Sequence, residues 1–86
     1  MKEVMNRVNG CISKGSPVIV TSSIGDFHIY STIVPVDMAE YDDVFIIYGS
    51  QGEEAQFPHI NDSEYDEILD SYCFDLGDNE ISIQFM

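Results

Sequence analysis

Apolar residues recur at helical spacing over the first fourteen positions of the chain. The residues that follow the i, i+3, i+4, i+7 pattern are Met1, Val4, Met5, Val8, Cys11 and Ile12. Lys14 and Gly15 suit the end of such a helix, because a cation is favoured in the last turn and glycine readily adopts the left-handed conformation that ends many helices. The pattern predicts a helix over residues 2–14.

Several runs with the composition of β-strands follow this helix. Residues 17–24, 27–34 and 44–48 are rich in Val, Ile, Phe and Tyr, and residues 81–86 alternate so that Ile81, Ile83 and Phe85 share one face. The two residues between the first two runs are Gly25 and Asp26, and glycine at the first loop position is typical of a type II′ hairpin. Pro35 predicts either the end of the second strand or a bend at its edge. Residues 55–60 predict a short edge strand that Pro58 stops.

A second helix is predicted after residue 60. Asn61 is a suitable N-cap, with Glu64 three residues later in the capping-box position. The apolar stripe that follows at helical spacing consists of Tyr65, Ile68, Leu69, Tyr72 and Cys73. Gly77 is a plausible stop for this helix.

The order of elements, α-β-β-β-(β)-α-β, predicts a small α+β fold. We expect a single acidic domain over residues 1–86, with a mostly antiparallel sheet of four to five strands and two helices packed on it. The second and third strands are apolar on both faces, so both sides of the sheet need cover. If the helices cover one side, the other is a candidate subunit interface, and a homodimer is one assembly that this pattern allows.

The distribution of charge departs from that of an ordinary soluble domain. The chain has 16 Asp or Glu and three Lys or Arg, with a formal net charge of −13. All three cations, Lys2, Arg7 and Lys14, lie in the first fourteen residues, and residues 15–86 contain 15 acids and no base. Surfaces of mixed sign favour stability, since neighbouring like charges repel. The acids therefore suggest recognition, and a merely solvated acidic face is the alternative that the sequence leaves open.

On the predicted second helix, the acids form a row. Asp62, Asp66 and Asp70 are four residues apart, with Glu67 beside them, so a helix would place a carboxylate roughly every 6 Å. The like-charged neighbours would together destabilise the helix by about 1–2 kcal/mol. Helix stability does not explain the row.

The predicted partner-binding residues come from this row and from residues 37–43, which are interpreted as a surface loop. Tyr41 lies between the acids of the loop and is a candidate anchor, since tyrosine is enriched at interface hot spots. The full set is Asp37, Glu40, Tyr41, Asp42, Asp43, Asp62, Asp66, Glu67 and Asp70.

The charge favours a basic partner, and extended basic surfaces belong mostly to nucleic-acid-binding proteins such as nucleases. We expect no direct binding of nucleic acid. In size and charge the chain is similar to small acidic inhibitors of phages and mobile elements, of the anti-CRISPR or anti-restriction type, which act as DNA mimics in a nucleic-acid channel. It is equally similar to immunity proteins and antitoxins that neutralise a basic nuclease toxin. An acidic structural adaptor subunit is a third hypothesis.

No catalytic constellation is recognisable. Cys11 and Cys73 follow the apolar stripes and are interpreted as buried reduced thiols, and neither His28 nor His59 has the spacing of a metal ligand. A glycine-rich phosphate loop with its lysine is also missing. We therefore expect no enzyme activity, no cofactor and no metal. The sequence also lacks a long apolar run and the apolar stretch of a signal peptide, which favours a cytoplasmic protein without membrane contact.

Overall fold

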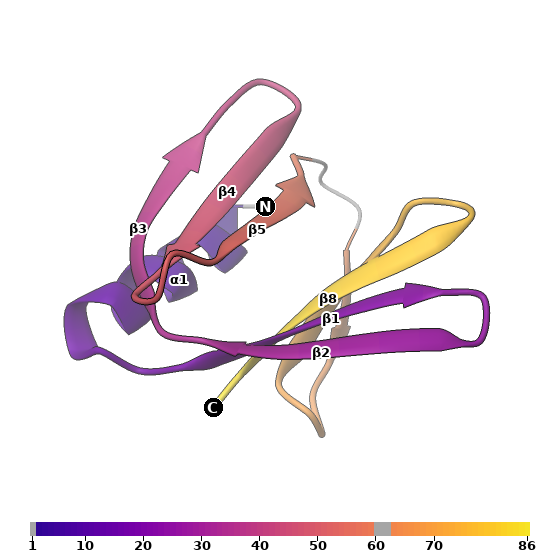
Figure 1. The fold of residues 1–86 in the computed structure, drawn as a ribbon, viewed down its shortest axis with the longest axis horizontal. Coiled ribbons are helices and arrows are strands. Elements are labelled where there is room, and N and C mark those ends of the chain that lie inside the picture. Colours follow the sequence, from indigo (N-terminus) through magenta and orange to yellow (C-terminus); the bar gives the residue numbers. More distant parts are fainter. Residues whose placement is uncertain (1, 60–62) are drawn as a thin grey trace.

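The computed structural model describes residues 2–59 and 63–86, and in these ranges one α-helix precedes eight β-strands in two antiparallel sheets (Figure 1). The α+β class is thus confirmed, whereas two helices and four to five strands were predicted. The elements are α1 (Lys2–Lys14), β1 (Val18–Ile24), β2 (Phe27–Ile33), β3 (Pro35–Glu40), β4 (Val44–Gly49), β5 (Glu54–Pro58), β6 (Glu64–Asp66), β7 (Ser71–Asp75) and β8 (Asn79–Phe85).

Helix α1 forms where the sequence predicts it. Val4 and Val8 are buried on its apolar face. The helix ends in a left-handed glycine, with φ of +67° at Gly15, and the N–H of Ser16 donates to the carbonyl of Cys11 at 3.0 Å. This is the hydrogen bond of a Schellman cap. Within the described ranges, no helix is both long enough and apolar enough to cross a membrane.

The larger sheet, termed sheet 1, has the strand order β2-β1-β8-β7-β6, and sheet 2 has the order β3-β4-β5. The predicted hairpin joins β1 and β2, with Ile24 opposite Phe27 across the two-residue loop. Gly25 has φ of +58° and Asp26 does not have a positive φ, as a type II′ turn requires. This hairpin extends away from sheet 2 (Figure 1).

The chain passes from sheet 1 to sheet 2 with one residue between the two strands. Strand β2 ends at Ile33 and β3 begins at Pro35, with a register shift between Pro35 and Asp37. Pro35 therefore marks a bend, one of the two predicted alternatives. The predicted loop over residues 37–43 is wrong in its first half, because β3 runs to Glu40 and pairs with β4, for example Met38 with Ile47. Pairing with an apolar neighbour strand outweighs the polar composition of this segment.

The predicted second helix is wrong. In its place β6 and β7 form an antiparallel hairpin, with Tyr65 opposite Tyr72. The carboxylate of Asp66 accepts from the N–H groups of Ile68 and Leu69 at 2.9 and 3.2 Å, so this side chain stabilises a turn instead of a helix. Asp70 has φ of +52°, which an α-helix does not accommodate. The like-charge repulsion expected along the helix favours the same outcome.

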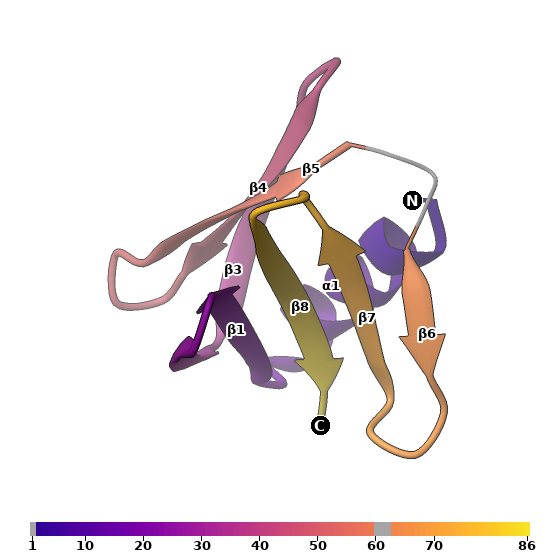
Figure 2. The same ribbon diagram turned by 90° about the vertical axis from the view of Figure 1, so that its right-hand side faces the viewer.

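The core lies between sheet 1, sheet 2 and α1. Phe45 and Phe57 of sheet 2 stack with ring centroids 5.0 Å apart, and Phe74 of sheet 1 meets Phe57 edge-on at 5.8 Å. In Figure 2, α1 lies behind β7 and β8, and its Val4 and Val8 belong to the same buried cluster. The helix thus covers the inner face of sheet 1, which leaves the outer face of this sheet to solvent.

Candidate partner-binding surface

The outer face of sheet 1 is polar because each strand alternates. In β8, Ile81, Ile83 and Phe85 pack against or belong to the core, so the residues between them point outward. The register of the strand pairs then shows which side chains of the other strands point to the same outer face. Four carboxylates belong to it, here termed the anionic face: Glu64, Asp66, Asp75 and Glu80.

The pairing of strands brings these four carboxylates close together. Asp75 is directly opposite Glu80, and Glu64 is opposite Cys73. At ordinary strand spacings, the most distant pair, Asp66 and Glu80, is roughly 17 Å apart. Four negative charges over this length approach the density of a nucleic-acid strand, which has one charge per about 3.4 Å.

The thiol of Cys73 lies among the carboxylates of the anionic face, and their charge affects its pKa. It donates a hydrogen bond to Oε2 of Glu80 at 3.6 Å. The pKa of Cys73 is raised from 9.0 to about 11, first by its partial burial and then by the negative charges of Glu80, Glu64 and Asp75. The prediction that Cys73 is a buried residue of a helix stripe is wrong, since this side chain is only partly buried and lies on the outer face.

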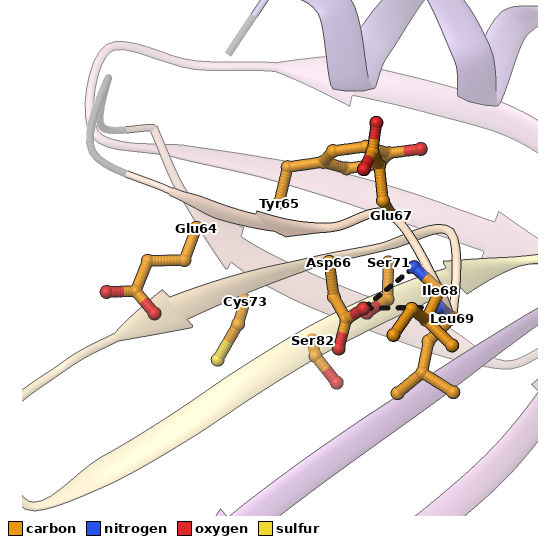
Figure 3. Close-up of a pocket in the computed structure, with 9 residues that line it drawn as sticks. All are labelled: Glu64, Tyr65, Asp66, Glu67, Ile68, Leu69, Ser71, Cys73 and Ser82. Atoms are coloured by element: carbon orange, nitrogen blue, oxygen red, sulfur yellow. Dashed lines mark hydrogen bonds between the residues drawn. The ribbon is translucent and has the colours of Figure 1, made fainter.

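Two apolar side chains project beside these carboxylates. They belong to the β6–β7 turn, where Ile68 is 94% exposed and Leu69 is also exposed. Residues 64–69 together with Ser71, Cys73 and Ser82 line an open depression of about 750 Å³ (Figure 3). Side chains of both kinds, charged and apolar, are therefore accessible to a partner at one place.

Asp66 and Glu67 point to opposite sides of the hairpin. Figure 3 shows Asp66 on the side of Glu64 and Cys73, and Glu67 on the side of the Tyr65 ring. Neighbouring residues of an extended strand alternate in this way, whereas a helix would have placed both on one polar side. Of the predicted row, only Asp66 lies on the anionic face, and Asp62 lies outside the described residues.

Asp70 makes contacts that stabilise the fold. Its carboxylate binds the Arg7 guanidinium through two contacts, Nη1–Oδ1 at 2.5 Å and Nη2–Oδ2 at 2.6 Å, and accepts from the Tyr65 hydroxyl at 2.7 Å. The hydrogen bonds from Arg7, followed by that from Tyr65, lower the pKa of Asp70 from 3.8 to about 2. The guanidinium carbon of Arg7 lies 4.2 Å from the centroid of the Phe85 ring. The negative charge of Asp70 is therefore compensated by the positive charge of Arg7 on α1.

All three cations of the chain are on α1, which packs against the inner face of sheet 1. Within residues 2–59 and 63–86, Arg7 pairs with Asp70 and His59 contacts Glu40, and neither contact involves the anionic face. Sheet 1 thus separates the basic residues of the chain from these four carboxylates.

The acids at the β3–β4 turn form a separate group. Glu40, Tyr41, Asp42 and Asp43 are exposed and follow one another at the end of β3, and His59 lies 3.1 Å from Oε2 of Glu40. Asp37 is exposed within β3. In both views of the fold, this turn and the β6–β7 turn lie at opposite ends of the molecule (Figures 1 and 2). Among the described residues, the predicted site residues therefore do not form one continuous surface.

Sequence reasoning did not select Asp75, Glu80, Ile68 or Leu69 as site residues. The alternation of polar and apolar residues over 79–85 was the available signal for Glu80. Because residues 61–76 were interpreted as helical, the pairing of β7 with β6 and β8 could not be anticipated.

The described residues contain no group of three His, Cys, Asp or Glu side chains arranged to hold a metal ion. Cys11 and Cys73 are both free thiols. No protein-family model, no curated protein and no solved structure matches this chain.

Proposed function

We propose that this chain is an acidic inhibitor that docks its anionic face on the basic nucleic-acid groove of a DNA- or RNA-acting enzyme. The observation that carries the proposal is the separation of charge by sheet 1: four carboxylates gather on the outer face, and Lys2, Arg7 and Lys14 are all on the helix behind it. A groove built to hold phosphates offers the matching field. The four carboxylates lie close enough together to bind in one such groove at the same time.

The like-charged pair Asp75 and Glu80 supports a role in recognition. Acids directly opposite each other in neighbouring strands destabilise a sheet. A basic partner would relieve this repulsion on binding, so the same charges that weaken the free protein strengthen the complex.

The test uses two double variants with the same change of net charge. Glu64→Lys/Glu80→Lys brings the net charge of the four-carboxylate anionic face to zero, and Asp42→Lys/Asp43→Lys reverses two acids of the β3–β4 turn. Tagged parent protein and variants are used to capture binding proteins from a bacterial lysate at low salt, and these are eluted at high salt. For each nucleic-acid-binding protein obtained, binding is measured in competition with duplex DNA or RNA.

We expect the parent and the Asp42/Asp43 variant to compete with the duplex, and the Glu64/Glu80 variant to lose most of its binding. Simultaneous binding of duplex and parent protein would overturn the proposal. So would equal binding by the Glu64/Glu80 variant and the parent.

A second candidate function is an immunity protein or antitoxin that binds a basic nuclease toxin beside its active site. The exposed Ile68 and Leu69 favour it, because apolar anchors next to charges are typical of specific protein interfaces. Ile68→Ala distinguishes the two functions. It should weaken an immunity-type complex at high salt and leave an electrostatic complex in the groove nearly unchanged.

A further inference from the structure

Strand β2 is a sheet edge without the usual protection against pairing. Edge strands are commonly protected by charges, proline, bulges or short length. Three of the four edges of this fold have such features: β6 is three residues long with Glu64 and Asp66, β3 is acidic and irregular, and β5 carries Glu54 and ends at Pro58. In contrast, β2 has seven residues, all in regular register with β1, and contains neither an acid nor a proline.

Strand β2 has large apolar side chains exposed on both faces. Phe27 is 78% exposed and Ile29 is 62% exposed, and both lie on the inner face. Tyr30, on the outer face, is 69% exposed. Since this strand belongs to the hairpin that extends beyond sheet 2, the core of the same chain does not cover these residues.

The free backbone groups of β2 follow from the hairpin. In a two-residue loop, the flanking residues Ile24 and Phe27 bond to each other, so every second residue from Phe27 to Ile33 directs its N–H and C=O toward β1. His28, Tyr30 and Thr32 therefore direct theirs outward. The next outward carbonyl, that of Val34, already accepts from the N–H of Ser50 at 2.9 Å. The available edge consists of these three residues.

We propose that β2 pairs antiparallel with β2 of a second copy of this chain, about a two-fold axis at Tyr30. In this register Tyr30 pairs with Tyr30 of the second copy, and His28 pairs with Thr32 of the second copy at either end. All six hydrogen-bonding groups of each outward edge are then used. Sheet 1 becomes continuous across both subunits, and Phe27 lies opposite Ile33 of the second copy.

Charge identifies a second copy as the occupant. Two chains of net charge −13 repel each other over most of their surfaces, yet residues 15–36 contain Asp26 as their one acid and no Lys or Arg. An uncharged edge that meets its own copy avoids this repulsion, and the contact is isologous, as in most homodimers. The carboxylates of the anionic face lie on β6, β7 and β8, so none of them is on the pairing strand, and they stay exposed in both subunits. The dimer goes beyond the proposed function and does not depend on it.

Sedimentation of the full chain over a range of concentrations measures the dimer. Ile29→Lys places a charge at the new interface, and Ile68→Lys is the matched control, with the same substitution at an exposed turn far from β2. We expect the parent and Ile68→Lys to dimerise alike and Ile29→Lys to raise the dissociation constant at least tenfold. A chain that remains monomeric at all concentrations, or equal effects of the two variants, would overturn the proposal.

Cysteine cross-linking tests the register. At the two-fold axis the Cα atoms of the two Tyr30 residues would be about 5.5 Å apart, within the range of a disulfide. The two His28 residues would be roughly 15 Å apart. Tyr30→Cys should therefore give a disulfide-linked dimer on mild oxidation, and His28→Cys should not. Cross-linking of His28→Cys that is as fast as that of Tyr30→Cys would overturn this arrangement.

Discussion

Arg7 and Asp70, 63 positions apart in the sequence, are joined by two hydrogen bonds of 2.5 and 2.6 Å. This pair ties α1 to the end of the β6–β7 turn, where Asp70 has a left-handed backbone conformation. The ring of Phe85 lies under the guanidinium, so the packing of β8 also fixes its position. The helix and the most acidic hairpin of the fold are thus held by the same contact.

We expect the Arg7–Asp70 pair to contribute to the acid resistance of the fold. The pKa of Asp70 is lowered from 3.8 to about 2, so its stabilising effect is complete above pH 3.8 and is lost as the pH falls through 2. Asp70→Asn should lower the free energy of unfolding at pH 6. The difference from the parent should shrink between pH 4 and pH 2, as measured by urea denaturation. Asp42→Asn, an exposed control, should leave the parent's profile unchanged, and an Asp70→Asn difference that is constant with pH would contradict the expectation.

The core of sheet 1 should be sensitive to the loss of one side chain. Ile83 is fully buried, and Ile83→Ala should lower the free energy of unfolding by about 2–5 kcal/mol. Ile68→Ala makes the same change at a side chain that is 94% exposed, and it should change stability by less than about 0.5 kcal/mol. Chemical denaturation compares the two. Equal effects would contradict the strand alternation on which the outer face depends.

Two glycines should respond in opposite directions to alanine. At Gly49, an added Cβ would lie 2.7 Å from Cγ2 of Ile33 and closer still to Oε1 of Glu53, so Gly49→Ala should destabilise by about 1–3 kcal/mol. At Gly10, within α1, the added Cβ would meet no atom within 4 Å apart from its chain neighbours and the nearby backbone of the helix, and Gly10→Ala should stabilise by about 0.5–1 kcal/mol. Thermal unfolding measures both signs.

Reversing one charge of the anionic face should stabilise the free protein. Glu80→Lys replaces repulsion from Asp75 with attraction, a gain of about 0.2–1 kcal/mol at low salt. The gain should decrease as salt is added, because the two side chains are exposed. A salt series of urea denaturation curves checks this, and a variant less stable than the parent at low salt would show that the two acids do not repel.

Cys73 should react slowly with thiol reagents. With its pKa raised from 9.0 to about 11 by burial and by Glu80, Glu64 and Asp75, its thiolate at pH 8 is about a hundred-fold scarcer than that of an ordinary cysteine. Glu80→Gln removes the nearest negative charge and should speed the reaction. Mass spectrometry after timed alkylation locates the modified residue. Unchanged reactivity in Glu80→Gln would show that the charge of Glu80 does not raise the pKa of Cys73.

The elements that could be predicted from the sequence are those set by neighbours in the chain. The spacing from Val4 to Ile12 and the glycine after Lys14 define α1, and Gly25 defines the β1–β2 hairpin. The segment after residue 60 has an apolar pattern that fits a helix as well as a hairpin with an apolar turn. The pairing of β7 with β8 and the salt bridge to Arg7 decide between them, and both are contacts between distant parts of the chain.

The same limit applies to the candidate surface. The excess of acids and the confinement of cations to the first fourteen residues are visible in the sequence. Which acids share a face depends on strand register, so Asp75 and Glu80 meet only once β7 and β8 are paired. The opposite case is Asp70, which belongs to an acidic run in the sequence. In the fold it forms a salt bridge with an arginine 63 positions away and so does not belong to the candidate surface.

Only one residue separates β2 from β3, so the connection between the two sheets has little conformational freedom. Ile33 and Pro35 are both buried, and the carbonyl of Val34 between them is held by Ser50 of the β4–β5 turn. A pull on the β1–β2 hairpin is therefore transmitted directly to sheet 2, and a hinge movement at this bend would have to break the hydrogen bond of Val34 first. We therefore expect the two sheets to move as one rigid body when a molecule binds either of them.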